Sequence, residues 1–94
     1  MSIMSELQIY ESLERMARAA EANNSAEVTS INYELSGLLH RQYGHLPNWS
    51  MNPDFLKYDY IRNAAGAAVS GLVPQDQALK EMRELFSQLP KPTK

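Results

Sequence analysis

Residues 52–71 read NPDFLKYDYIRNAAGAAVSG, and they contain the clearest helix signals in the chain. Asn52 is a good N-cap, and Pro53 suits the first helical position, where its missing N–H removes no hydrogen bond. Gly71 suits the left-handed residue that commonly ends a helix, and Leu72 is placed for the apolar contact that often accompanies such an ending. These signals predict a helix over 53–70.

This predicted helix is apolar on two sides. At 100° per residue, the apolar residues separate into two groups, Tyr58, Ile61, Ala65, Ala68 and Val69 on one side and Leu56, Tyr60 and Ala67 on the other. A helix that is apolar on two sides is usually central in its domain. The run of small residues from Ala64 to Ala68 also leaves little bulk, so a neighbouring helix can pack closely against it.

Two helices are predicted before this one. Apolar residues at helical spacing predict helices over about 5–22 and 25–43. Ser5 fits the start of the first helix as the N-cap of a capping box with Gln8, and Met4 stands at a hydrophobic-staple position. The connection between the two helices is only two or three residues long, which implies an antiparallel hairpin.

A fourth helix is predicted over 74–89, opened by Pro74 at its first position and stopped by Pro90. The chain is therefore expected to be all-α, with residues 1–94 forming a single antiparallel up-and-down four-helix bundle. We expect residues 1–4 and 90–94 to be frayed ends. The alternative architecture is a pair of helical hairpins that dimerise.

The composition excludes several classes of protein. The chain has 94 residues, no cysteine, a net charge of −2 and a sequence pI near 5.6. Disulfides, thiolate metal sites and thiol nucleophiles are therefore absent, and nothing in the charge favours nucleic acid or an anionic membrane. The start of the chain is acidic and no stretch approaches ~20 apolar residues, so we expect a cytoplasmic protein without a membrane partner.

The sequence contains no motif for catalysis, a metal or a cofactor. His40 and His45 are separated by a predicted helix end and do not share a helix face. The glycines form no phosphate-binding or dinucleotide loop, and no serine lies in a nucleophile-elbow motif. The Lys and Arg residues are scattered, which makes a DNA-binding regulator the weakest alternative. We expect a protein that is not an enzyme and uses no metal, cofactor or small-molecule substrate.

Residues 43–60, YGHLPNWSMNPDFLKYDY, hold five of the eight Phe, Tyr and Trp side chains in the chain. Rigid aromatic side chains dominate the binding energy at many interfaces. One interpretation is therefore a partner-binding surface, and its candidate residues are Tyr43, Trp49, Leu56 and Tyr60. The other is that Leu46, Trp49 and Met51 fold down over the end of the bundle. The sequence favours this second interpretation for the loop and leaves Leu56 and Tyr60 open.

Interaction is the function that remains. We expect a small non-enzymatic module of bacterial or phage origin, such as an adaptor, chaperone, inhibitor or immunity-type protein, that binds a protein partner through residues 43–60 and the helix 53–70. The alternative is a homo-oligomeric structural subunit with the helix 53–70 at its seam.

Overall fold

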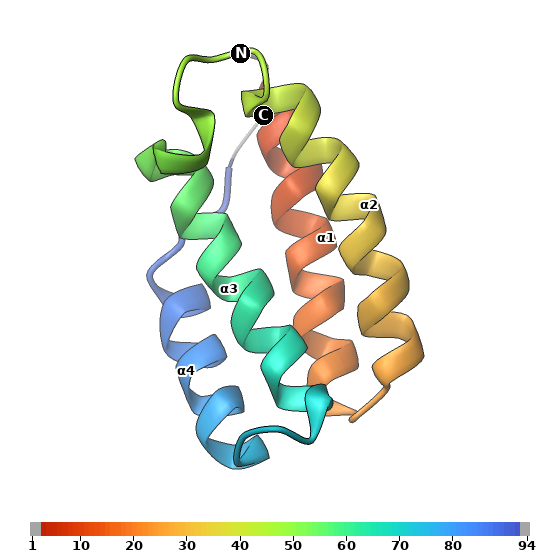
Figure 1. Cartoon of the computed structure of the whole chain (residues 1–94). Coiled ribbons are helices and arrows are strands. Elements are labelled where there is room, and N and C mark those ends of the chain that lie inside the picture. The colour runs from red at the N-terminus through yellow and green to blue at the C-terminus, as the bar shows by residue number, and fades with distance from the viewer. Residues whose placement is uncertain (1–2, 93–94) are drawn as a thin grey trace.

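The chain forms a four-helix bundle. A computed structural model describes residues 3–92, with helices α1 (Ile3–Glu21), α2 (Ser25–Tyr43), α3 (Pro53–Ser70) and α4 (Gln75–Ser87), and a short 3₁₀ turn η1 (Trp49–Met51). Consecutive helices run in opposite directions, and the 44–52 connection lies at the same end of the bundle as the start of α1 (Figure 1). The predicted all-α, up-and-down bundle is confirmed.

The central two helices begin and end where the sequence predicts, because their end signals are local. The Asn24 side-chain oxygen accepts a hydrogen bond from the N–H of Glu27, at 3.1 Å. The Asn52 side-chain oxygen accepts from Asp54 at 2.8 Å and from Phe55 at 3.3 Å, directly before Pro53. These side chains satisfy N–H groups that have no partner inside the first turn of a helix.

The outer two helices differ from the prediction at their ends. Helix α1 already begins at Ile3, so Ser5 lies inside the helix and residues 3–4 are not frayed. The Met4 side chain, like residues 1–2 and 93–94, lies outside the part that the structure describes.

Helix α4 is shorter than predicted at both ends. Pro74 has ψ 124°, an extended value that makes it the N-cap rather than the first helical residue. At the other end, the N–H groups of Gln88 and Leu89 donate to carbonyls only three residues back, at 3.3 and 3.0 Å, which is the tighter 3₁₀ pattern that often closes a helix. Leu89 nevertheless remains buried.

For the turn between α3 and α4, the predicted backbone conformation is confirmed, but the predicted apolar contact is wrong. Gly71 has φ +76°, the left-handed conformation predicted for it. Leu72, however, is 88% exposed, so the expected apolar contact after the helix end is not made.

Helix α3 is central, as its two apolar sides predict. It packs against α1, α2 and α4, and its contact with α4 is much the most extensive of the three. In Figure 1, α2 and α4 lie on opposite sides of it. Ala64, Ala65 and Ala68 are buried in these contacts, so the small-residue run is used for close packing.

Polar side chains connect the helices at the rim of the core. Arg83 of α4 donates two hydrogen bonds to the Glu21 carboxylate of α1, at 2.7 and 2.6 Å. Arg62 of α3 donates to Ser36 of α2 at 2.8 Å, while its other nitrogens are held by Asp59. The Arg83–Glu21 pair is largely exposed and therefore fixes register more than it adds stability, whereas the Arg62 and Asp59 side chains are mostly buried.

Leu35 tests the core assignment. Its side chain is fully buried between helices, so Leu35→Ala should lower the free energy of unfolding by ~2–5 kcal/mol through the cavity it leaves. Leu72→Ala, which removes the same atoms from an exposed site, should change stability by less than about 0.5 kcal/mol. Urea denaturation of both variants measures the difference, and equal losses would contradict the packing described.

Two glycines in and just beyond α2 should respond in opposite directions to the same substitution. A Cβ on Gly44 would lie 2.5 Å from the backbone oxygen of His40 and 2.6 Å from its ring, whereas a Cβ on Gly37 meets nothing within 4 Å. Gly44→Ala should therefore destabilise the protein by about 1–3 kcal/mol through overpacking. Gly37→Ala should stabilise it by up to about 1 kcal/mol through helix propensity. Thermal unfolding of both variants tests the sign of each effect.

Candidate functional site

Four of the five aromatic residues in segment 43–60 pack together, and the fifth, Tyr60, is exposed. The ring of Tyr43, which is 1% exposed, lies 6.2 Å from that of Phe55 and 6.5 Å from that of Tyr58. Trp49 stands edge-on to Phe55 at 5.2 Å. These four aromatic residues therefore pack together at the end of the bundle where α2 meets α3.

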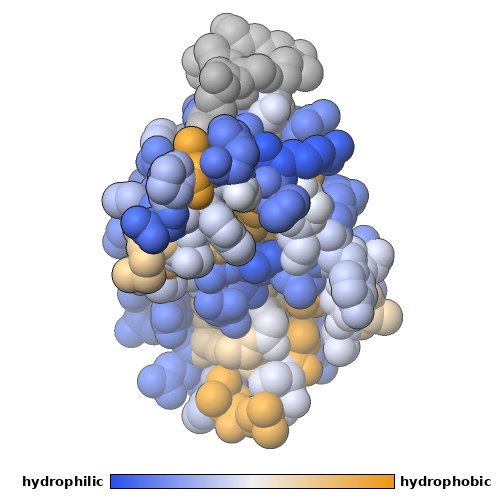
Figure 2. Space-filling view, turned by 45° about the horizontal axis from the view of Figure 1, so that its top comes forward, coloured by the Kyte–Doolittle hydropathy of each residue, from blue (hydrophilic) through white to orange (hydrophobic). Residues whose placement is uncertain are grey.

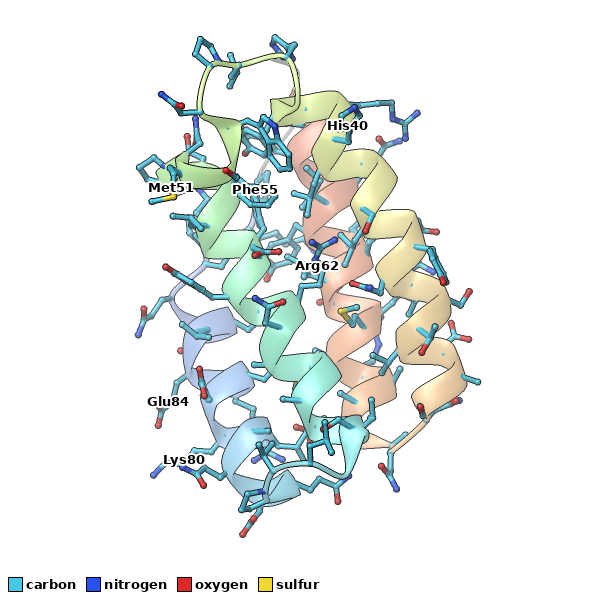
Figure 3. The ribbon with its side chains drawn as sticks, in the orientation of Figure 1. His40, Met51, Phe55, Arg62, Lys80 and Glu84 are labelled. Carbon is cyan, nitrogen blue, oxygen red and sulfur yellow. The ribbon has the colours of Figure 1, made fainter. Side chains whose placement is uncertain are left out.

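This cluster corrects the expectation that Tyr43 contacts a partner, because a buried ring offers no surface. Trp49 is 36% exposed and rests on Phe55, and Leu46 packs partly buried against the core, as the folded-down interpretation predicts. Met51 does not follow them: it is 71% exposed and points away from the cluster, on the side of α3 opposite to His40 (Figure 3).

Burial makes the two inward tyrosines hard to ionise. Loss of solvent, together with the nearby carboxylates of Glu6 and Asp54, raises the pKa of Tyr58 to about 12. Loss of solvent also raises the pKa of Tyr43 well above its ordinary value, with Tyr58 and the same two carboxylates adding to the effect. Both hydroxyls therefore remain neutral near pH 7, which suits packing and not proton transfer.

Tyr60 and Leu56 lie together elsewhere, in a hollow of about 380 Å³ between α3 and the end of α4. Pro53, Leu56 and Tyr60 form one wall, and Leu85, Leu89 and Pro90 form the other. Of the residues that line this hollow, only Lys57 is charged. The hollow is therefore an apolar site with one positive group.

A second hollow of about 240 Å³ lies between the same two helices, nearer their connecting turn. Its walls are made by Ala64 and Ala67 of α3, by Val73 and Pro74, and by Gln77, Ala78 and Glu81. The α3 residues of both hollows, Pro53, Leu56, Tyr60, Ala64 and Ala67, follow one another at spacings of three and four, which places them on one helix face. We call the two hollows together the α3–α4 groove.

Most exposed hydrophobic residues are associated with this groove. Among the large apolar side chains exposed in residues 5–92, Tyr60 (52%) and Val73 (47%) line it, Leu72 precedes Val73 in the turn at its lower end, and Met51 lies beside the start of α3. Figure 2 shows a hydrophobic area at the lower edge of the molecule, the end at which the α3–α4 turn lies. Trp49 and Tyr33 are exposed elsewhere.

The sequence identifies Leu56 and Tyr60 as site candidates, because they lie on the second apolar side of α3. Leu85 and Leu89 share the apolar stripe of α4 with the buried Met82, so their spacing assigns them to the core. The structure does bury Leu89 and packs Leu85 against the core, and both also line the hollow, which the spacing does not predict. No local signal predicts that Leu72 and Val73 remain exposed.

Within residues 3–92, three ion pairs lie outside the groove. Arg15 pairs with Glu34, Arg62 with Asp59, and Arg83 with Glu21. Ser12 donates a hydrogen bond of 2.5 Å to the same Glu34 carboxylate, which leaves that hydroxyl engaged within a surface network. In the described part of the chain, no three or more His, Asp or Glu side chains lie close enough together to hold a metal ion.

No protein-family model, curated protein or solved structure matches this chain. None of the helices within residues 3–92 combines the length and the apolar character needed to cross a membrane. The function of the chain is therefore inferred from the geometry of the α3–α4 groove.

The buried tyrosines predict a loss of stability at alkaline pH. Unfolded tyrosine ionises near pH 10, whereas Tyr58 in the folded protein has a pKa of about 12 and that of Tyr43 is also raised. The folded state therefore favours the protonated forms, so their contribution is complete below pH 10 and is lost as the pH rises above it.

Chemical denaturation at a series of pH values should show stability falling above pH 10, and less steeply in Tyr58→Phe than in the unmodified protein. A Tyr58→Phe curve parallel to that of the unmodified protein would contradict the assignment.

Proposed function

We propose that this chain is a small non-enzymatic protein-binding module of the cytoplasm, and that its α3–α4 groove is the binding surface. The observation that carries the proposal is the position of Tyr60 and Leu56 in an apolar hollow that lies on the same α3 face as a second hollow, together with exposed hydrophobic residues near the ends of that face. Contiguous exposed apolar surface on a small domain commonly marks a protein interaction site.

The form of the groove supports a helical or extended segment of protein as the ligand. Its α3 wall extends from Pro53 to Ala67, which is about 21 Å at 1.5 Å per residue. A groove of that length between two parallel walls resembles the sites that receive the apolar face of an amphipathic helix. Tyr60 suits the role of an anchor, because an exposed aromatic side chain offers large contact area with little conformational freedom to lose.

The polar clusters do not favour a catalytic role. The Ser12 hydroxyl and the Arg62 guanidinium are both held by carboxylates, and neither residue lines the α3–α4 groove. The hollow that contains His40, Trp49 and Arg62 has a volume of about 170 Å³, which is below the usual size of a small-molecule site, ~300–1,000 Å³.

Site-specific photo-crosslinking tests the proposal. A benzophenone amino acid in place of Tyr60 should give covalent adducts with protein in cells that express the chain, because position 60 lies in the binding groove. The same amino acid in place of Tyr33, which is more exposed but lies on α2, should give few. Mass spectrometry of the adducts identifies what is bound.

A second substitution in the groove makes this experiment specific. Leu56→Asp should remove the adducts formed at position 60, because it places a charge in the apolar α3 wall of the groove. Circular dichroism checks that the variant remains folded. Equal adduct yields at positions 60 and 33, or adducts that are insensitive to Leu56→Asp, would refute the groove as the binding surface.

A further inference from the structure

We infer that the occupant of the α3–α4 groove is a second copy of this chain, packed with its α3 antiparallel to the first about a two-fold axis at the level of Tyr60 and Ala64. This inference rests on the proposed function, since it names the partner of that same groove. A two-fold interface requires a surface that is complementary to itself. Three features of the groove meet this requirement.

The first feature is a gradient of side-chain size along α3. The upper half of the face that lines the groove carries Leu56 and Tyr60, and the lower half carries Ala67 and the buried Ala64. When two copies of α3 pack antiparallel, the large side chains of each lie opposite the small side chains of the other. The hollow lined by alanines then receives the Tyr60 ring, and both halves are filled by the same operation.

The second feature is the arrangement of charge. The charged residues that line the groove are Lys57 in the upper half and Glu81 in the lower half. The antiparallel arrangement places the Lys57 half of each copy over the Glu81 half of the other, so two opposite-charge approaches form together. Lys57 is available for this contact, because its pair with Asp54 is long, at 3.4 Å, and exposed.

The third feature is the position of the exposed residues at the two ends. Met51 lies beside the start of α3, and Leu72 and Val73 lie in the turn after its end. Antiparallel packing brings the upper end of one copy to the lower end of the other, which covers these side chains with apolar surface. The exposure of Leu72, for which the isolated chain gives no reason, is then explained.

The area indicates a weak dimer. A face about 21 Å long and two helices, or about 20 Å, wide projects about 400 Å². Its accessible surface exceeds that projection but remains below or near the ~800 Å² per partner of a standard stable interface. Interfaces at this small end of the range occur in weak, transient complexes, so we expect reversible association, with a dissociation constant between about 1 μM and 1 mM.

Sedimentation equilibrium with charge-exchanged variants tests the inference. The unmodified protein should pass from monomer to dimer between about 1 μM and 1 mM, as expected of a weak, transient complex. Lys57→Glu and Glu81→Lys should each raise the dissociation constant by about tenfold, because each converts two symmetric attractions into repulsions. An equimolar mixture of the two variants should associate as tightly as the unmodified protein, since both contacts of the mixed dimer again join opposite charges.

Lys80→Glu is the matched control. It makes the same change of charge as Lys57→Glu, but Lys80 projects from the outer side of α4, away from the groove (Figure 3). It should leave the dissociation constant within about twofold of the unmodified value. Circular dichroism of each variant confirms that the helices are intact, which is expected because all three side chains are exposed.

Two outcomes would overturn the inference. One is an unmodified protein that remains monomeric up to about 1 mM, the upper end of the expected range of the dissociation constant. The other is a dimer in which the mixture of Lys57→Glu and Glu81→Lys associates no more tightly than either variant alone. Adducts between position 60 and a different protein would then retain the groove as a binding surface while excluding the second copy, so the two proposals fail separately.

Discussion

Burial of the inward side of α3 is the constraint on which the rest of the structure depends. This helix contacts the other three, while α2 and α4 lie on opposite sides of it. Ala64, Ala65 and Ala68 provide close contact without bulk, and Tyr58 and Ile61 provide buried area. A helix that packs against neighbours on these sides keeps one face uncovered. That face of α3 contains Leu56, Tyr60 and Ala67, and it forms one wall of the groove.

The aromatic cluster fixes the end of the bundle where the longest connection lies. Tyr43 closes α2, and its ring packs against Phe55 and Tyr58 of α3, so the start of α3 is held against the end of α2. Asn52 caps α3 at the same place, which leaves little freedom for the intervening residues. The concentration of aromatics in residues 43–60 is thus mainly structural. Tyr60 is the exception, because it follows the other apolar side of the helix.

The sequence predicts the fold well where the determinants are local. Helices α2 and α3 begin and end as predicted, since Asn24, Asn52 and Gly71 act on their own neighbouring backbone. The predicted end of α4 lies two residues too late, because Leu89 continues the apolar spacing although the backbone there already follows the tighter 3₁₀ pattern. The burial of Tyr43 is also predictable from the sequence, because Tyr43 follows Leu35 and Leu39 at intervals of four and so continues the buried stripe of α2. Its position in the aromatic-rich segment 43–60 favours the opposite prediction, a partner contact, which is wrong.

The groove is harder to predict because it depends on how two helices are oriented toward each other. Both α3 and α4 carry apolar arcs that are wider than one neighbour can cover. On α4, Met82 is buried while Leu85 lines the groove, although both belong to one stripe. Only the packing of α3 against α4 determines which edge of each arc faces the core. Since both uncovered edges lie beside the same interhelical seam, the surplus apolar surface of the two helices gathers in one place, and that coincidence distinguishes the groove, as the proposed binding surface, from scattered exposed residues.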